Sequence, residues 1–236
     1  MNLTDILKGA LGVYRRHPGR MFLVAAPSIP LTVAGILVRP ESWVLAVVIL
    51  PIAFMVFYAV PAAALVRAVA DALESTAPDF WRSYAAVVSR LGPLMLAALR
   101  FSVIIQALSI IIVGTPLAFY LLVRWLFFQH AIMLEDARAG ASLNRSGDLV
   151  TGSWWRVFGI TLVILIIVWV PGAFVGLLLF KPVGGFGLGL LSAPPGIGAT
   201  AAAITGAITL PFAVSADTIL FFDLRRRRAR AAIAVA

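Results

Sequence analysis

Two arginines and one aspartate lie within apolar stretches of the sequence, where a charge is costly. Arg100 and Arg124 interrupt the third and fourth stretches, and Asp217 interrupts the last one. At 1.5 Å per helical residue, the two arginines differ in depth by roughly 3 Å, so they should repel each other unless they are neutralised. Charges inside a membrane usually mark a ligand pathway or an ion pair. We expect either an anionic ligand, such as a phosphate headgroup, held by both arginines, or the commoner structural arrangement, a link to Asp217 or snorkelling towards the interface.

The other polar residues of the apolar stretches offer little chemistry. Gln106, Gln129 and His130 are typical of hydrogen bonds between membrane helices. His17 and His130 have no third metal ligand near them in sequence, and neither lies in a recognisable nucleophile motif. The chain has no cysteine, which excludes thiol-bound metals. We therefore predict that the protein is not an enzyme and that it has no metal site and no cofactor.

The densest group of charges follows the fourth apolar stretch. It is interpreted as a solvated interfacial helix with weak local ion pairs, and the alternative is a docking surface for a cytoplasmic protein partner. The candidate docking residues are Glu135, Arg138, Arg145, Asp148 and Arg156.

A second basic cluster closes the last apolar stretch. Anionic lipids attract such clusters by about 1 kcal/mol per residue, whereas an ordinary positively charged flank of a membrane span needs no specific ligand. The ordinary flank is the simpler interpretation. The candidate contacts to anionic lipid are Arg225, Arg226, Arg227, Arg228 and Arg230.

The composition favours a membrane environment for the whole chain. Of the 236 residues, 62% are hydrophobic and 12% are charged, with a mean hydropathy of +1.03, whereas a soluble domain has about 25% charged residues. The net charge of +9 is scattered along the chain rather than gathered in a patch, which argues against nucleic-acid binding. We predict an all-α, polytopic membrane protein with a single domain over residues 1–236. Its six transmembrane helices are expected at about 21–38, 42–66, 91–114, 115–134, 157–180 and 196–222.

Three amphipathic segments precede these helices in a regular order. Apolar residues at helical spacing predict two or three interfacial helices, at about 3–14 and 79–90 and, from a less complete pattern, at 139–151. Each is followed by an outward helix and a return helix, so the unit occurs three times. Residue identity between the units is poor, and the pattern fits either three helix-hairpin pseudo-repeats or convergent topology.

The placement of the positive charges predicts the orientation. Of the 19 lysines and arginines, Arg39 and Lys181 fall in outward loops, Arg100 and Arg124 fall inside spans, and the other 15 fall at the opposite ends and loops. Basic residues concentrate on the cytoplasmic side of membrane proteins. Both termini are therefore expected in the cytoplasm of a bacterial cell, with the chain crossing the inner membrane several times.

The segment after the fourth span also resembles a known family. It is similar to the membrane domain attached to some bacterial glycerophosphodiester phosphodiesterases and found in related stand-alone proteins. The start Asp5–Tyr14 and the ending Phe221–Arg225 are similar too, and Ser142 replaces the usual alanine. The resemblance implies a six-helix membrane fold; the phosphodiesterase domain is missing, so no catalytic residue is carried over. The matching residues are Glu135, Ser142–Leu143–Asn144–Arg145–Ser146, Leu149, Gly152 and Trp155–Arg156.

Together these features predict a non-catalytic membrane scaffold or accessory subunit. Its expected partners are the anionic lipids of the cytoplasmic leaflet, a membrane protein complex or a cytoplasmic protein. The alternative is a small transporter or lipid-handling protein that binds an anion at Arg100 and Arg124.

Overall fold

Helices account for nearly all of the structure, a computed structural model that describes residues 1–37, 41–42, 44–179 and 195–235. No strand occurs among these residues, as predicted. The elements in chain order are α1 (Leu3–Arg16), α2 (Pro18–Ala25), α3 (Ser28–Leu37), the π-helix η1 (Leu45–Ile49), α4 (Leu50–Leu73), α5 (Phe80–Val88), α6 (Leu91–Ile110), the 3₁₀-helix η2 (Ile112–Gly114), α7 (Thr115–Arg124), α8 (Phe128–Glu135), α9 (Ala139–Val150), α10 (Trp154–Leu179) and α11 (Pro195–Val235).

The helices are long and apolar enough for a membrane protein, but six spans are not confirmed. Among the described residues, four helical segments are long and apolar enough to cross a bilayer, namely Val47–Leu73, Leu91–Ile110, Thr115–Glu135 and Ala203–Arg230. The number rises to five if α9 and the adjoining part of α10, which meet at 100°, count as one bent span. The first predicted span, 21–38, is broken into the 8-residue α2 and the 10-residue α3. Pro27 lies between them, and proline cannot donate the backbone hydrogen bond of a continuous helix. The outward charges Arg39 and Lys181 lie outside the described residues.

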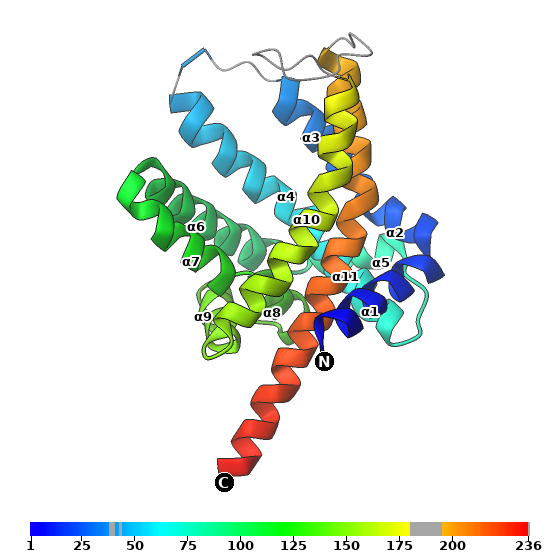
Figure 1. Ribbon diagram of the computed structural model, residues 1–236, viewed down its shortest axis with the longest axis vertical. Helices are drawn as coiled ribbons and strands as arrows, with labels where there is room; N and C mark the ends of the chain where they lie inside the picture. Colours follow the sequence, from blue (N-terminus) through cyan, green and yellow to red (C-terminus); the bar gives the residue numbers. More distant parts are fainter. Residues whose placement is uncertain (38–40, 43, 180–194, 236) are drawn as a thin grey trace.

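The three amphipathic segments form helices close to their predicted bounds, as α1, α5 and α9. Each precedes a helical hairpin, which is the expected order of elements. α1 packs against α11 and is inclined to it (Figure 1), and its buried face is formed by Ile6, Ala10 and Val13. α5 is fastened to α2 by Tyr84, whose hydroxyl donates to the carbonyl of Val24 at 3.0 Å. Burial raises the pKa of the Tyr84 phenol, so this donor stays protonated in neutral solution.

The core has two parts, which meet along α11. One surrounds the small-residue face of α4, where Ala59, Ala63 and Ala64 are almost completely buried and let other helices approach closely. The other gathers apolar residues of α1, α7, α8, α9 and α10 around the lower half of α11, including Phe127 and Phe221. Figure 1 shows α11 running the height of the bundle and projecting beyond it at its C-terminal end. We call the end of the bundle where the N-terminus and the run Arg225–Arg230 lie the basic end.

Two of the intramembrane polar residues make the interhelical hydrogen bonds that the sequence predicts. Gln106 on α6 donates from Nε2 to the carbonyl of Val47 in η1 at 2.6 Å. The backbone hydrogen bonds of a π-helix differ from those of an α-helix, and the Gln106 side chain gives the Val47 carbonyl a donor from another helix. His130 on α8 lies 3.1 Å from the Thr218 hydroxyl on α11.

Candidate functional site

Arg100 and Arg124 approach the same helix, α9, at two glycines. The Nη1 atom of Arg100 lies 3.2 Å from the position that a β-carbon on Gly140 would occupy, and the Nε atom of Arg124 lies 2.7 Å from that position on Gly147. The glycines are seven residues apart, so they lie on one face of α9 about two turns from each other. Arg100 is exposed and Arg124 is half-buried. Both arginines therefore contact α9, about two turns apart, and their predicted similarity in depth stays a prediction.

The predicted ion pair between these arginines and Asp217 is not formed within the described residues. Arg124 donates from Nη1 to the Tyr120 hydroxyl at 3.2 Å, and no acidic group pairs with it there. The Oδ1 atom of Asp217 is buried with no hydrogen-bond partner in the protein. Arg124 instead contacts α9 at Gly147. Both arginines keep uncompensated positive charge in the described structure.

An aromatic cavity of about 290 Å³ lies between α7 and α10, next to Arg124. Tyr120 stacks on Trp154 with ring centroids 5.7 Å apart, and the Trp154 indole donates to the Tyr120 carbonyl at 3.2 Å. The same Tyr120 accepts the hydrogen bond from Arg124. Tyr120 therefore both lines the aromatic cavity and binds the guanidinium group of Arg124. The cavity is lined by Pro116, Phe119, Tyr120, Trp154 and Trp155.

The predicted docking loop uses most of its charges inside the protein. Glu135 accepts from Arg145 at both oxygens, at 2.7 and 3.1 Å, and Arg225 of α11 lies 3.5 Å from it. Arg156 is likewise engaged, by the carboxylate of Asp223. Arg138 and Asp148 remain exposed without a side-chain partner in the described structure. The loop is thus an ion-paired joint between α8, α9 and α11 with two open charges.

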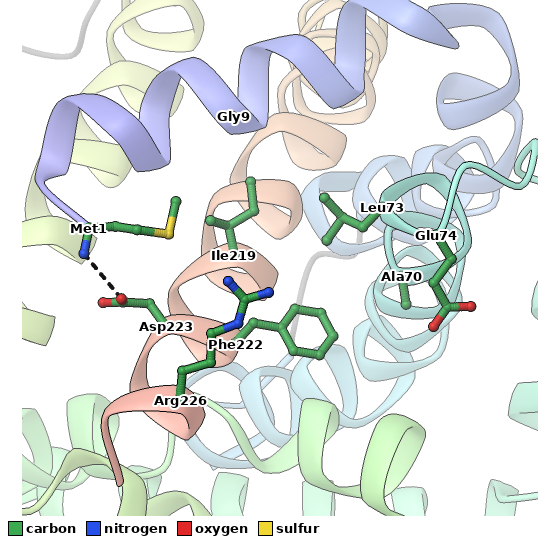
Figure 2. Close-up of a pocket in the computed structure, with 9 residues that line it drawn as sticks. All are labelled: Met1, Gly9, Ala70, Leu73, Glu74, Ile219, Phe222, Asp223 and Arg226. Atoms are coloured by element: carbon green, nitrogen blue, oxygen red, sulfur yellow. Dashed lines mark hydrogen bonds and ion pairs between the residues drawn. The ribbon is translucent and has the colours of Figure 1, made fainter. Parts of the chain in front are cut away.

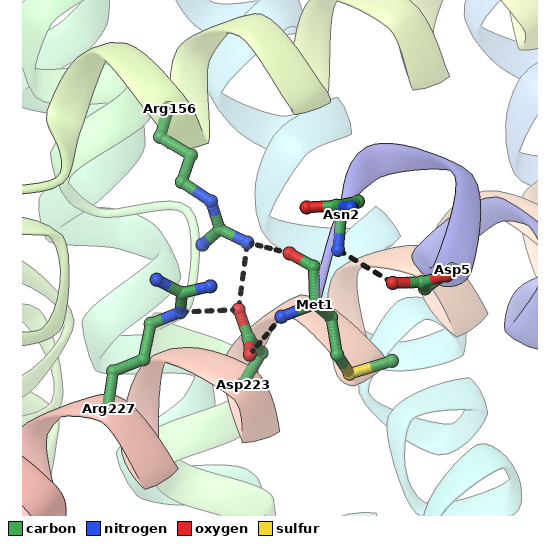
Figure 3. A network of polar contacts seen from close by, with 6 residues as sticks. All are labelled: Met1, Asn2, Asp5, Arg156, Asp223 and Arg227. Atoms are coloured by element: carbon green, nitrogen blue, oxygen red, sulfur yellow. Dashed lines mark hydrogen bonds and ion pairs between the residues drawn. The ribbon is translucent and has the colours of Figure 1, made fainter.

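Asp223, which the sequence did not mark as a site, is the centre of a polar network at the basic end (Figure 3). Its Oδ2 accepts from Arg156 Nη2 and from Arg227 Nε, each at 2.9 Å. Its Oδ1 lies 3.2 Å from the amino group of Met1, whose carbonyl accepts from Arg156 at 2.7 Å. The Asp223 side chain is 8% exposed. One carboxylate therefore holds α1, α10 and α11 together.

The five arginines at the end of α11 divide into two groups. Three serve the structure: Arg225 lies by Glu135, Arg227 pairs with Asp223, and Arg228 donates to the carbonyls of Asp148 and Thr151 at the C-terminal end of α9. Such carbonyls lack partners within the helix, and a cation is favourable there. Arg226 and Arg230 are exposed and pair with no acidic group in the described part of the chain. They are the open cations of the run.

A cavity of about 430 Å³ opens beside Arg226, between α1, α4 and α11 (Figure 2). Most of its wall is apolar, and Glu74 lies across from Arg226. A smaller cavity of about 280 Å³ adjoins the same arginine and is bordered by Arg227 and Arg230. The larger cavity is lined by Met1, Gly9, Ala70, Leu73, Glu74, Ile219, Phe222, Asp223 and Arg226.

Gly9 determines how closely α1 approaches this cavity. A β-carbon there would lie 3.0 Å from the terminal carbon of Ile219, whereas one on Gly12 would meet nothing within 4 Å. Gly9 therefore leaves room for Ile219 between α1 and α11.

The sequence contained one signal for the contacts between arginines and glycines, namely the seven-residue spacing of Gly140 and Gly147, which puts both on one helical face. It contained no comparable signal for Asp71, which is 2% exposed and pairs with Arg67 at 2.9 Å and Arg82 at 2.8 Å.

A family model described as Domain of unknown function (DUF7847) matches residues 1–222. No curated protein and no solved structure matches the chain. The match ends within α11, before Asp223 and the basic run Arg225–Arg230, and its description names no activity. The resemblance to the membrane domain of glycerophosphodiester phosphodiesterases stays a prediction.

Proposed function

The chain belongs to the DUF7847 family, and we propose that it is a non-catalytic membrane scaffold or accessory subunit that binds anionic phospholipid at its basic end, in the cytoplasmic leaflet of the bacterial inner membrane. The observation that carries this proposal is the cavity between α1, α4 and α11, with Arg226 at its edge. A lipid phosphate would contact the arginine, and a hydrocarbon chain would lie in the cavity.

One face of α11 supports both halves of such a ligand. Ile219, Phe222, Arg226 and Arg230 follow one another at intervals of three, four and four residues, so they share a side of the helix. The first two are apolar and line the cavity, and the last two are the open cations of the basic run. A phospholipid has the same division, with an apolar chain joined to a negative phosphate.

The size and chemistry of the cavity suit this ligand. Small-molecule sites usually have volumes of roughly 300–1,000 Å³, and 430 Å³ lies in that range. Each buried methylene group contributes about 0.8 kcal/mol, and each arginine near an anionic surface contributes about 1 kcal/mol. Glu74, on the other wall, can accept a hydrogen bond from a hydroxyl or ammonium of the headgroup.

The test is native mass spectrometry of the full chain after mild detergent extraction from bacterial membranes. Wild type and an Arg138→Gln control are expected to retain phospholipid, and an Arg226→Gln/Arg230→Gln double variant to lose most of it. Arg138 is a matched control because it is exposed and makes no side-chain pair in the described structure. Retention that is equal in all three proteins, or absent from wild type, would overturn the proposal.

A second pair of variants tests the apolar half of the site. Leucine at Gly9 would point at Ile219 and occupy the cavity, whereas a β-carbon at Gly12 on the same helix meets nothing within 4 Å. We expect Gly9→Leu to reduce lipid retention and Gly12→Leu to leave it unchanged. The same spectra test the accessory role, since a stoichiometric protein partner in the wild-type extract supports it, and a consistently monomeric protein opposes it.

A second candidate function is anion transport or lipid handling at Arg100 and Arg124. The observation that favours it is that both guanidinium groups lie on glycines of α9 without an acidic partner in the described structure, and that one of them adjoins the aromatic cavity of α7 and α10. Lipid flux between vesicles that contain the purified protein tests it. Arg100→Gln/Arg124→Gln should reduce flux severalfold if this function holds, and equal flux in both proteins would eliminate it.

A further inference from the structure

Five side-chain atoms of the described residues are buried without a hydrogen-bond partner. Two of them, Oδ2 of Asp71 and Nη1 of Arg156, belong to residues that form ion pairs, and the other three lie away from both arginine sites. They are Nδ1 of His130 on α8, Oγ1 of Thr161 on α10 and Oδ1 of Asp217 on α11. Burying a polar atom without a hydrogen bond costs about 1–3 kcal/mol in proteins. Buried groups left open in this way are expected where they bind something, and an ionisable residue inside a membrane protein is a functional candidate.

The helix register brings these groups to a similar depth. Arg156 on α10 pairs with Asp223 on α11, and the two helices run antiparallel in contact. Thr161 is five residues beyond Arg156, and Asp217 is six residues before Asp223, which are shifts of about 8 and 9 Å along the two axes. His130 joins the same level, because it contacts Thr218, the neighbour of Asp217.

The hydrogen bonds determine the state of His130. The Thr218 hydroxyl donates its single proton to the Val214 carbonyl at 2.7 Å, so it must accept from His130 Nε2 at 3.1 Å. In a neutral imidazole with the proton on Nε2, Nδ1 is a free acceptor. The ring is 4% exposed and is held between Phe127 and Phe221, with centroids 5.6 and 5.4 Å away. At this depth the bundle therefore contains an imidazole acceptor on His130, the carboxyl of Asp217 and the hydroxyl of Thr161. No cation of the described structure pairs with the carboxyl.

We propose that His130, Thr161 and Asp217 form an internal proton-binding site, in which the Asp217 carboxylate takes up one proton from solution and internal water connects the three groups. Uptake forms the O–H bond of a carboxylic acid and removes the uncompensated negative charge. The acid then donates to water or to the free acceptor of His130. Protonation is the available means of neutralisation, because each charged group described on the helices that pack against α11 is engaged or exposed. These groups are Asp5, Lys8, Arg15, Arg16 and Arg20, all exposed; Arg67 with Asp71; Arg145 with Glu135; Asp148, exposed; and Arg156 with Asp223.

The site is independent of the proposed lipid binding, since it shares no residue with the cavity at Arg226. Infrared spectroscopy of the full purified chain tests it directly. Wild type is expected to show the carbonyl band of a protonated carboxylic acid that decreases as the pH rises, and Asp217→Asn is expected to lack this band at every pH. Asp148→Asn, which changes an exposed acid, is the matched control and should keep the band.

Two further measurements test the composition of the site and its preference for a proton over a metal cation. Replacing Thr161 by valine or His130 by glutamine should shift the pH at which the band decreases, and an unchanged midpoint in both variants would remove these groups from the site. If sodium raises the melting temperature at constant pH and Asp217→Asn abolishes that effect, the site binds a metal cation and the proton proposal is wrong. A spectrum of Asp217→Asn identical to wild type also overturns it.

Discussion

Arg156 and Asp223 are joined by a 2.9 Å hydrogen bond between Nη2 and Oδ2, although 67 residues separate them in the chain. The contact holds the start of α10 against α11 just where the cavities of the basic end begin. Arg227 binds the same oxygen from the next turn of α11. The charges in this region therefore include a structural set, centred on Asp223, and an open set, Arg226 and Arg230.

Removing the charge of Asp223 should destabilise the protein. Asp223→Asn keeps the shape of the side chain but weakens charged hydrogen bonds to Arg156 and Arg227, for an expected loss of about 1.5–3 kcal/mol. The melting temperature in detergent, followed by tryptophan fluorescence, measures this. Asp148→Asn changes an exposed carboxylate and should melt like wild type. Equal melting of the two variants would mean that the network contributes little.

Alanine at Gly147 should displace Arg124. Its β-carbon would lie 2.7 Å from Nε, which is closer than unbonded atoms approach, so the guanidinium must move from α9. Replacing a glycine within a helix by alanine normally raises the stability of the protein, by up to about 1 kcal/mol. Gly159→Ala on α10 is the control, because a β-carbon there would meet nothing within 4 Å, and it should show this gain or no change in stability. Thermal unfolding is expected to show a smaller gain for Gly147→Ala than for Gly159→Ala, because the displaced guanidinium loses its hydrogen bond to Tyr120. A gain like that of Gly159→Ala would show that the position of Arg124 is not constrained.

The amphipathic helices could be predicted from the sequence because their pattern is local. The expected segments 3–14 and 139–151 form α1, Leu3–Arg16, and α9, Ala139–Val150. The spacing of apolar residues shows which side of a helix is buried, and this spacing can be read within a few turns of the same helix. Pro27 also indicated the break between α2 and α3. The segment was nevertheless predicted as one span, because it contains enough apolar residues to cross a bilayer.

The polar contacts could not be predicted in the same way, because they depend on which helices pack together. Arg124 and Asp217 have suitable charges and comparable depth, yet Arg124 faces Gly147. Arg226 and Arg227 are adjacent in sequence, yet one borders the cavity and the other pairs with Asp223. A rotation of about 100° between neighbouring residues of a helix separates these roles, and the direction of each face is known only from tertiary structure.

The hydrogen bond from Gln106 to Val47 should stabilise the pairing of α6 with η1. Gln106→Leu keeps the apolar contacts but leaves the Val47 carbonyl without its 2.6 Å donor. Hydrogen bonds between membrane helices contribute about 0.6 kcal/mol on average and up to about 1.7 kcal/mol, so a small fall in the melting temperature is expected. Ser109→Ala on the same helix is the control, since Ser109 donates to a carbonyl of its own helix, Ile105, at 2.8 Å. A fall no larger than that of the control would exclude a role for Gln106 in this pairing.

The orientation of the chain can be tested with single cysteines, because the sequence contains none. The basic-end charges predict that Arg138 and Asp148 face the cytoplasm and that Glu41, which directly precedes the second predicted span, faces outward. A membrane-impermeant maleimide applied to intact spheroplasts should label Glu41→Cys and leave Arg138→Cys and Asp148→Cys unlabelled. Inverted vesicles should give the opposite result, and detergent should expose all three sites as the labelling control. Labelling of Asp148→Cys in spheroplasts would reverse the topology, and it would move the proposed lipid site at Arg226 from the cytoplasmic leaflet to the outer one.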